Sequence, residues 1–149
     1  MDINLELRPF QPSDQPIVKQ LILAGLVEHW GVLDPTLNPD LNDIAHTYAA
    51  GDFIVACING EIIGTGAIIP ENKNGRVVRM SVKKEKRRLG IATVILNHLI
   101  EIAKDKGYEQ VVLETTSTWQ DVIQFYLRNN FTITHHADGD THFVLSLCQ

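Results

Sequence analysis

The apolar residues of the chain follow two different spacings, one typical of helices and one typical of strands. Across residues 91–106 they recur at every third or fourth position, and Gly107 ends the run, which predicts an amphipathic helix. Residues 53–58 and 62–69 are instead rich in β-branched side chains, and the Asn59-Gly60 pair between them favours a two-residue hairpin turn. The chain therefore combines helices with at least one antiparallel pair of strands.

The remaining elements follow from the same spacings and from the residues that start or end them. Ser13 and Asp14 provide an N-cap for a helix that runs to about Glu28. The predicted apolar stripe of this helix consists of Ile17, Val18, Leu21, Ala24 and Gly25. Further helices are predicted at 42–50 and 120–129, and further strands at 6–8, 76–82, 110–114, 131–136 and 141–147. The order is a mixed α/β one, in which hairpins and crossovers occur together.

Length and composition are typical of one folded domain. The chain has 149 residues, of which 44% are hydrophobic and 21% charged, so we expect residues 1–149 to form a single domain. The first residues lack the basic and apolar regions of a secretory signal, and the longest uninterrupted apolar stretch, 21–27, is too short to span a bilayer. Cys57 and Cys148 are too few for a disulfide framework. These features favour a cytoplasmic protein that does not enter a membrane.

The net charge of −5 is unevenly distributed along the chain. Residues 20–72 contain seven acidic residues and no Lys or Arg, whereas five of the 13 basic residues lie within 83–88. A cationic loop on an acidic protein suggests an anionic ligand. A solvated turn is the alternative that the charges alone leave open.

The cationic loop lies between a predicted strand and the amphipathic helix that follows it. A helix N-terminus leaves backbone N–H groups unpaired, and together with the helix dipole these groups form a seat for phosphate oxygens. Gly90 and Ala92 keep that seat open, while Arg87 and Arg88 add charge-assisted hydrogen bonds nearby. The loop contains neither a Walker A motif nor a GxGxxG fingerprint. It suits a diphosphate with a long neutral arm.

Two motifs in the second half of the chain carry a family resemblance. The run Arg87-Arg88-Leu89-Gly90-Ile91-Ala92 fits the pattern (Arg/Gln)-x-x-Gly-x-(Gly/Ala), and residues 125–131 read Phe-Tyr-Leu-Arg-Asn-Asn-Phe. They resemble the pyrophosphate loop and the Phe-Tyr-x-x-x-Gly-Phe signature of the GNAT superfamily of acetyl-CoA-dependent N-acyltransferases. The order of elements matches that family over about residues 6–147. The chain departs from the family pattern at Trp119, where relatives often carry Asn, and at Asn130, where they carry Gly.

The resemblance implies a fold and a cosubstrate. The implied fold is a central mixed, mostly antiparallel sheet of six or seven strands, with a splay between two parallel central strands and about four flanking helices. In the family, the pantetheine arm of acetyl-CoA pairs with backbone groups of the strand before the loop, which here are those of Met80, Ser81 and Val82. The residues that correspond to the pyrophosphate loop are Arg87, Arg88, Leu89, Gly90, Ile91, Ala92 and Thr93.

The resemblance also implies an acid, Tyr126, that stabilises or protonates the departing thiolate after an amine attacks the thioester. A phenol can donate a hydrogen bond to a thiolate while it stays neutral. The alternative is that Tyr126 is an ordinary core aromatic residue.

A general base is harder to assign. Many relatives place a Glu on the strand before the loop, and residues 76–82 contain none. Glu114, at the end of the following strand, is the substitute that we predict. Two alternatives stay open, namely that Glu28 or His29 acts through a water molecule, or that Glu114 is a strand-end residue facing solvent.

The acceptor site of this fold generally involves the first helices and their loop. Glu28, His29 and Trp30 lie there, in a segment without cations, which predicts a small cationic amine as the substrate. An acidic solvated edge is the alternative. The sequence leaves open a protein lysine or N-terminal acceptor, a non-catalytic acyl-CoA sensor of the same fold, and a homodimeric assembly.

Metal ions and nucleic acids are not predicted as partners. The chain has six histidines, and the neighbours His135 and His136 point to opposite faces of a strand, without an HxxxH motif or a carboxylate cluster. The basic run is one short loop that lacks the interleaved aromatic residues on which bases stack.

Overall fold

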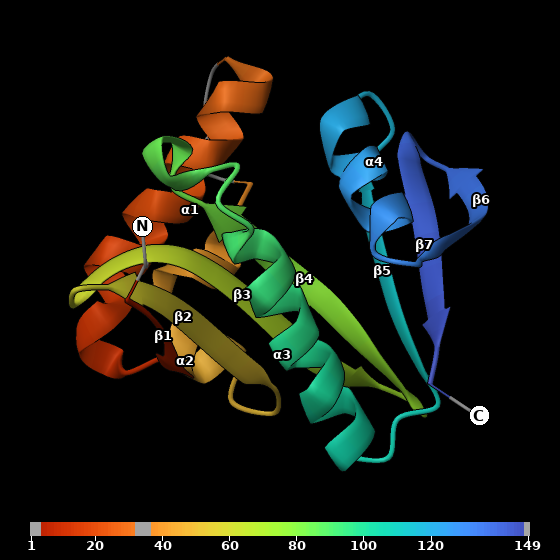
Figure 1. The fold of residues 1–149 in the computed structure, drawn as a ribbon, viewed down its shortest axis with the longest axis horizontal. Helices are drawn as coiled ribbons and strands as arrows, with labels where there is room; N and C mark the ends of the chain where they lie inside the picture. Colours follow the sequence, from red (N-terminus) through yellow and green to blue (C-terminus); the bar gives the residue numbers. More distant parts are fainter. Residues whose placement is uncertain (1–3, 32–36, 148–149) are drawn as a thin grey trace.

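The structure, a computed structural model, describes residues 4–31 and 37–147. The helices are α1 (Gln15–Trp30), α2 (Ile44–Thr47), α3 (Ile91–Asp105) and α4 (Gln120–Arg128) (Figure 1). The strands are β1 (Leu5–Pro9), β2 (Asp52–Ile58), β3 (Glu61–Glu71), β4 (Asn74–Val82), β5 (Gln110–Thr116), β6 (Thr132–Ala137) and β7 (Asp140–Ser146). Cys148 lies outside the described residues.

Within the described residues, the seven strands form one sheet in the order β1-β2-β3-β4-β5-β7-β6. Neighbouring strands are antiparallel except β4 and β5, which are parallel. The predicted fold class, a mixed and mostly antiparallel sheet with four flanking helices, is confirmed. The predicted hairpin is confirmed too, since Asn59 and Gly60 have φ values of 52° and 83° and join β2 to β3.

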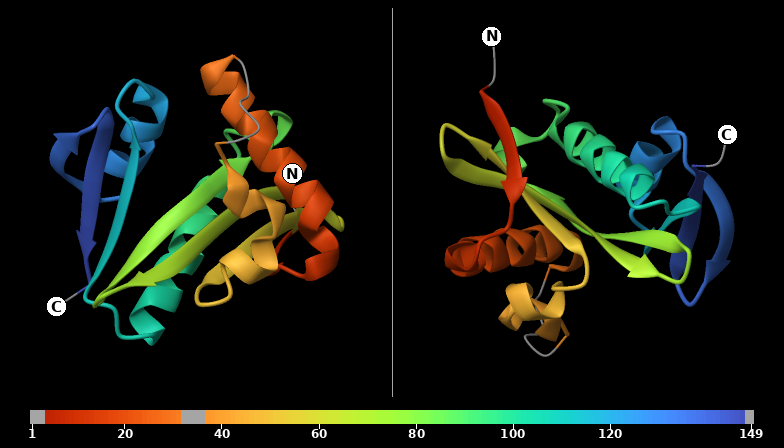
Figure 2. Two further views of the ribbon diagram at one scale, coloured as in Figure 1. Left: turned by 180° about the vertical axis from the view of Figure 1, so that it is seen from behind. Right: turned by 90° about the horizontal axis from the view of Figure 1, so that it is seen from below.

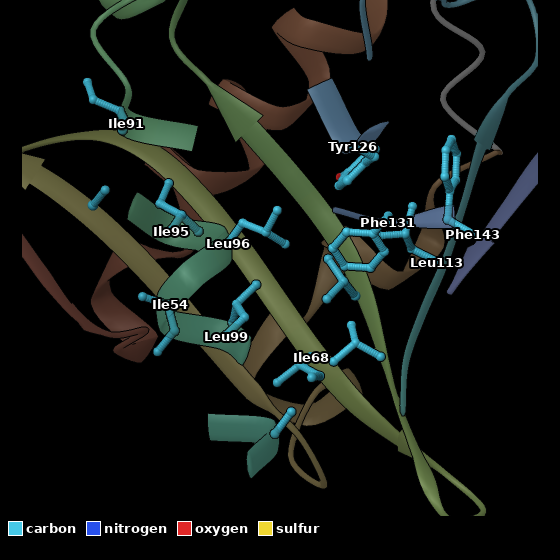
Figure 3. Close-up of a cluster of buried hydrophobic side chains, with 14 of the residues drawn as sticks. Ile54, Ile68, Ile91, Ile95, Leu96, Leu99, Leu113, Tyr126, Phe131 and Phe143 are labelled. Carbon is cyan, nitrogen blue, oxygen red and sulfur yellow. The ribbon is translucent and has the colours of Figure 1, made fainter. Parts of the chain in front are cut away.

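Helices cover both faces of the sheet, with α3 and α4 on one face and α1 and α2 on the other (Figure 2). The larger core lies beneath α3 and α4, where Leu99 and Ile95 of α3 are fully buried and Tyr126 packs near Phe131 and Phe143 (Figure 3). The smaller core lies beneath α1 and α2 and contains Val18, Ile22, Leu41, Ile44, Phe53, Val55, Cys57, Ile62 and Ala67.

The predicted stripe of α1 is confirmed at Val18, Leu21 and Gly25 and is wrong at Ile17 and Ala24, which are exposed. The helix buries Val18 and Ile22, which are four residues apart and therefore lie on one face, whereas Ile17 is 54% exposed. Leu21 and Gly25 are half-buried beside that face. The apolar composition of this helix gives little directional signal, so contact with the sheet decides which residues are covered.

The second helix is shorter than predicted. Instead of one helix over 42–50, a 3₁₀ turn (Pro39–Asn42) precedes α2, which has four residues. Asp43 caps α2, because its Oδ1 accepts a hydrogen bond of 3.2 Å from the His46 N–H. None of the helices in the described ranges is long and apolar enough to cross a membrane.

The parallel strands β4 and β5 separate soon after they meet. They pair at two positions, Gly75 with Val111 and Arg76 with Val112. Beyond these positions the strands diverge, and the gap between them is visible from both sides in Figure 1 and Figure 2. The later backbone groups of β4 therefore lack a partner on the β5 side, as the resemblance predicted.

Candidate active site

A cavity of about 710 Å³ opens where β4 and β5 separate. Side chains and backbone from α1, β4, β5 and α4 form its walls. Eight of the predicted site residues line it, namely His29, Met80, Ser81, Val82, Arg87, Ala92, Glu114 and Tyr126. Seven predicted site residues are not part of its lining, namely Glu28, Trp30, Arg88, Leu89, Gly90, Ile91 and Thr93.

Tyr126 joins the core to the cavity. Its ring is 5% exposed and packs against Phe125, Phe131 and Phe143 at centroid distances of 5.0, 5.7 and 5.6 Å. Its hydroxyl makes no hydrogen bond to any of the described residues. Burial raises the pKa of Tyr126 above its ordinary value, so the phenol is neutral and keeps its proton as a donor. Figure 3 shows the side chain in the gap between β4 and β5.

The loop between β4 and α3 holds the N-terminus of α3 at the cavity. After a short 3₁₀ turn (Lys84–Lys86), Arg88 and Gly90 adopt left-handed backbone conformations with φ values of 66° and 79°. Ile91, the first residue of α3, is 3% exposed and fixes the first turn to the core. Ala92 follows it and lines the cavity. The unpaired N–H groups of this turn are therefore held beside the cavity without a bulky side chain over them.

Arg87 is bound by Glu28 across the mouth of the cavity. Its Nη1 and Nη2 donate to the two carboxylate oxygens of Glu28 at 2.6 and 3.0 Å, and its Nε donates to the Val82 carbonyl at 3.0 Å. Glu28 was predicted at the acceptor site, but its carboxylate holds Arg87, which was predicted at the diphosphate. The end of α1 and the start of α3 are joined by this ion pair.

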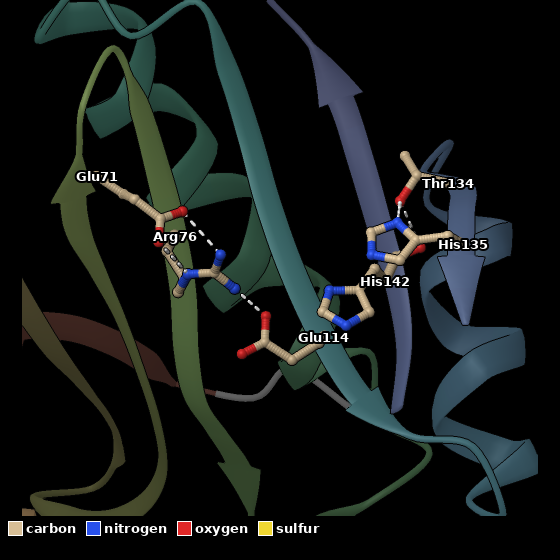
Figure 4. Close-up of polar contacts among 6 residues, drawn as sticks. All are labelled: Glu71, Arg76, Glu114, Thr134, His135 and His142. Atoms are coloured by element: carbon tan, nitrogen blue, oxygen red, sulfur yellow. Dashed lines mark hydrogen bonds and ion pairs between the residues drawn. The ribbon is translucent and has the colours of Figure 1, made fainter. Parts of the chain in front are cut away.

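Glu114 lies in a row of polar side chains that crosses the sheet (Figure 4). Arg76 donates from Nη1 to Glu114 and from Nη2 to Glu71, the latter at 2.7 Å. On the other side, Glu114 is in register with His142, whose ring stacks on His135 at a centroid distance of 4.2 Å. Glu114 lines the cavity, and its carboxylate is already engaged by the guanidinium group of Arg76.

His29 lies against Trp119 at the other side of the cavity. The two rings stack at a centroid distance of 4.1 Å and an interplanar angle of 27°, and both residues line the cavity. Trp30 is 56% exposed and contacts Trp119 at 5.5 Å. Trp30, which was predicted at the acceptor site, thus packs beside Trp119 at the start of α4 and does not line the cavity.

One network in the cavity wall was missed by the sequence analysis. Arg79, in a β-bulge with a φ of 54°, donates to Asp40 from Nε at 2.9 Å and from Nη2 at 2.7 Å. The Tyr48 hydroxyl donates to Asp40 at 2.5 Å, and burial together with this bond raises the pKa of Tyr48 to about 12. Burial opposes ionisation of Asp40, and the hydrogen bonds from Arg79 and Tyr48 outweigh it, so the pKa of Asp40 is lowered.

Comparison with known proteins agrees with this geometry. The model of the acetyltransferase (GNAT) family matches residues 18–131. The N-acetyltransferase family 8 member 2 of Rattus norvegicus is 35% identical over 108 residues, which are 67% of this chain and 48% of that protein. The chain therefore spans about half the length of the curated relatives it matches.

Solved structures share the fold over nearly the whole chain. A GNAT-family acetyltransferase from Staphylococcus aureus Mu50 has a TM-score of 0.88 at 23% identity, covering 97% of this chain and 99% of that one. A GNAT-family acetyltransferase from Elizabethkingia anophelis, solved with acetyl-CoA bound, has a TM-score of 0.74 at 21% identity with the same coverage. From the match to the family model and the shared fold, we conclude that this chain belongs to the GNAT acetyltransferase family.

Proposed function

We propose that the chain is an N-acetyltransferase that moves the acetyl group of acetyl-CoA to an amine, with residues 1–149 acting as one catalytic domain. The observation that carries the proposal is the Tyr126 hydroxyl, a neutral donor at the cavity between β4 and β5 that has no partner in the part of the chain that the structure describes. Membership in the GNAT family supports the reaction class. The acetyl-CoA bound to the similarly folded Elizabethkingia anophelis protein supports the cosubstrate.

The residues at the cavity fit the parts of acetyl-CoA. On the β5 side, the backbone of Met80, Ser81 and Val82 is free to pair with pantetheine amides as a neighbouring strand would. The first turn of α3, with Arg87 beside it, offers N–H groups and a guanidinium to the diphosphate. At the reacting end, the Tyr126 hydroxyl is a donor without a hydrogen-bond partner among the described residues.

In the proposed reaction, the amine nitrogen forms a bond to the acetyl carbon, the C–S bond breaks, and the electron pair leaves on the sulfur of coenzyme A. Tyr126 donates a hydrogen bond to that sulfur, which stabilises the negative charge as it develops. Because burial keeps the phenol protonated, the donor is present across the neutral pH range. The carboxylate of Glu114, the residue that the sequence predicts as the base, is bound to Arg76.

Charge at the cavity supports a small cationic amine as the acceptor. The basic residues of its wall are paired, Arg79 with Asp40 and Arg87 with Glu28. By contrast, Asp121 and Asp140 line the cavity and have no ion-pair partner among the described residues. The unpaired charge of the lining is therefore negative, which attracts cations and repels anions. The cytoplasmic location and the homodimer stay predictions.

An acceptor screen tests the proposal. Putrescine, tryptamine, Nα-acetyl-lysine amide and glutamate are each incubated with the protein and acetyl-CoA, and free thiol and acetylated amine are measured. We expect thiol release with an acetylated product, and a rate with putrescine or tryptamine at least about tenfold above that with glutamate. A preference for glutamate contradicts the cationic acceptor. Binding of coenzyme A without thiol release from any amine contradicts catalysis and favours an acyl-CoA sensor.

Substitution of Arg87 tests the diphosphate site. Charge-assisted hydrogen bonds contribute about 1.5–3 kcal/mol each, but Arg87 must first leave Glu28, so we expect Arg87→Ala to weaken coenzyme A binding by about tenfold. Isothermal titration calorimetry measures this affinity.

Two matched variants accompany the Arg87 measurement. Glu28→Gln releases the guanidinium and is expected to strengthen binding. Lys73→Ala removes a charge whose side chain is 81% exposed and is expected to change nothing. Equal affinities for wild type and Arg87→Ala would place the diphosphate elsewhere.

A further inference from the structure

We infer that His29 is the general base of the acetyl transfer, an inference that rests on the proposed function. The attacking amine arrives as an ammonium ion and must lose a proton before it can attack. β4 carries no carboxylate, and the carboxylate of Glu114 is bound to Arg76. His29 lines the same cavity as Tyr126, and among the described residues it is the one histidine in that lining.

The hydrogen bond of the His29 ring fixes which nitrogen can accept a proton. Nδ1 lies 3.2 Å from the carbonyl oxygen of Gly25, one helical turn earlier. A carbonyl oxygen only accepts hydrogen bonds, so Nδ1 carries the hydrogen and the lone pair of the neutral ring is on Nε2. None of the described residues hydrogen-bonds to Nε2. The ring is thus held in the tautomer that a base requires, with its accepting nitrogen free.

Stacking on Trp119 holds the ring at the cavity. Trp119 is the residue before α4, and Tyr126 lies seven residues later within that helix, about 10 Å further along the chain axis if each residue rises as in an α-helix. Trp119, Tyr126 and His29 all line the cavity. The segment 119–126 therefore sets the position of the phenol directly and the position of the imidazole through the stacked indole, and both groups line one cavity.

The proton balance of the reaction assigns separate tasks to the two groups. The amine nitrogen loses two protons when an ammonium ion becomes an amide. The first breaks its N–H bond and binds Nε2 of His29, directly or through one water molecule, and then passes to solvent. The second ends on the sulfur of coenzyme A, which receives the electron pair of the broken C–S bond and a hydrogen bond from Tyr126. The products are the amide, the free thiol and one released proton.

Variants of His29 test the inference in the full chain. His29→Phe keeps a ring that can stack on Trp119 and removes the lone pair, whereas His29→Ala removes both. With the fastest amine of the panel, we expect both variants to lose about a hundredfold in kcat. Added imidazole is expected to restore part of the activity of His29→Ala, because a free base can fill the space, and to leave His29→Phe unchanged. Calorimetry with coenzyme A is expected to give the wild-type affinity for both.

Two further measurements separate His29 from its competitor. We expect Glu114→Gln to keep at least about a third of the wild-type kcat, because Glu114 is not the base in this inference. Loss of a general base would instead lower kcat by about 100-fold or more. In wild type without any ligand, ¹⁵N NMR at pH 8 is expected to show His29 with its hydrogen on Nδ1. The inference is overturned if His29→Phe keeps its kcat, if Glu114→Gln loses it instead, or if the hydrogen is on Nε2. If wild type itself releases no thiol, the proposed function fails, and the inference fails with it.

Discussion

Tyr126→Phe is expected to lower kcat by about 100- to 1,000-fold while coenzyme A binds as it does to wild type. The substitution removes one hydroxyl and leaves the ring that packs against Phe131 and Phe143. Because the hydroxyl makes no hydrogen bond to the described residues, its loss leaves no protein group without a partner. The melting temperature is therefore expected to stay within about 2 °C of wild type, since the free energy of unfolding changes by less than 0.5 kcal/mol.

The pH profile gives the same residue a second signature. Burial raises the pKa of Tyr126 above its ordinary value near 10, so the neutral donor persists to a higher pH than in a free phenol. We expect wild-type kcat to show no decline from phenol ionisation below about pH 10.

Tyr48→Phe is the matched control for Tyr126→Phe. It removes the other tyrosine hydroxyl of the cavity wall, which donates to Asp40 at 2.5 Å. That variant is expected to lose about 1–2 kcal/mol of stability and to keep most of its activity, because its hydroxyl holds the wall together. A wild-type kcat for Tyr126→Phe would show that Tyr126 is not the acid. Equal losses of kcat in both variants would show that the effect comes from disturbing the cavity wall and not from the loss of a catalytic hydroxyl.

Leu99→Ala is expected to lower the free energy of unfolding by about 3 kcal/mol, which corresponds to roughly 10 °C in melting temperature. Leu99 is fully buried in α3 and packs over Gly66 of β3, where its Cδ1 is 3.1 Å from the position that a Cβ would occupy. Without a side chain on Gly66, the sheet beneath has nothing to fill the space that the substitution leaves. The cost therefore includes a cavity as well as lost apolar burial.

Val94→Ala is the control for Leu99→Ala on the same helix. Val94 is 42% exposed, so its truncation leaves no cavity and is expected to change stability by less than about 0.5 kcal/mol. Thermal unfolding followed by circular dichroism measures both variants. Melting temperatures that agree between them would show that α3 does not anchor the larger core.

Local patterns predicted the parts of the fold that local forces decide. The Asn59-Gly60 turn, the amphipathic helix before Gly107 and the loop at Gly90 each depend on residues within a few positions of one another, and each is present. The resemblance to the GNAT superfamily supplied the separation of β4 from β5, which no single segment encodes. Several strand and helix ends are as predicted, and the others differ by one to three residues, because pairing with a neighbour decides where a strand stops.

The contacts of the candidate site were harder to predict because they join distant parts of the chain. Arg87 and Glu28 are 59 residues apart, and Arg79 and Asp40 are 39 apart. The positions of charged residues in the sequence do not show which acidic and basic side chains form ion pairs in the fold. The acidic segment was interpreted as a field for the substrate, whereas three of its carboxylates, those of Glu28, Asp40 and Glu71, hold arginines in place. The stacking of His29 on Trp119 had no signal in the sequence at all.

The two residue pairs between β4 and β5 divide the molecule into two half-sheets that share a short seam. Gly75 lies at the seam because a Cβ there would come within 2.6 Å of Ile68 and 2.7 Å of Tyr108. One half-sheet, with α3, presents the groups that fit the diphosphate and the pantetheine arm. The other, with α4, carries Tyr126. The position of Tyr126 relative to the proposed acetyl-CoA site is therefore set at the seam. Small changes in packing around Gly75 would cause larger displacements at the far, open ends of the strands.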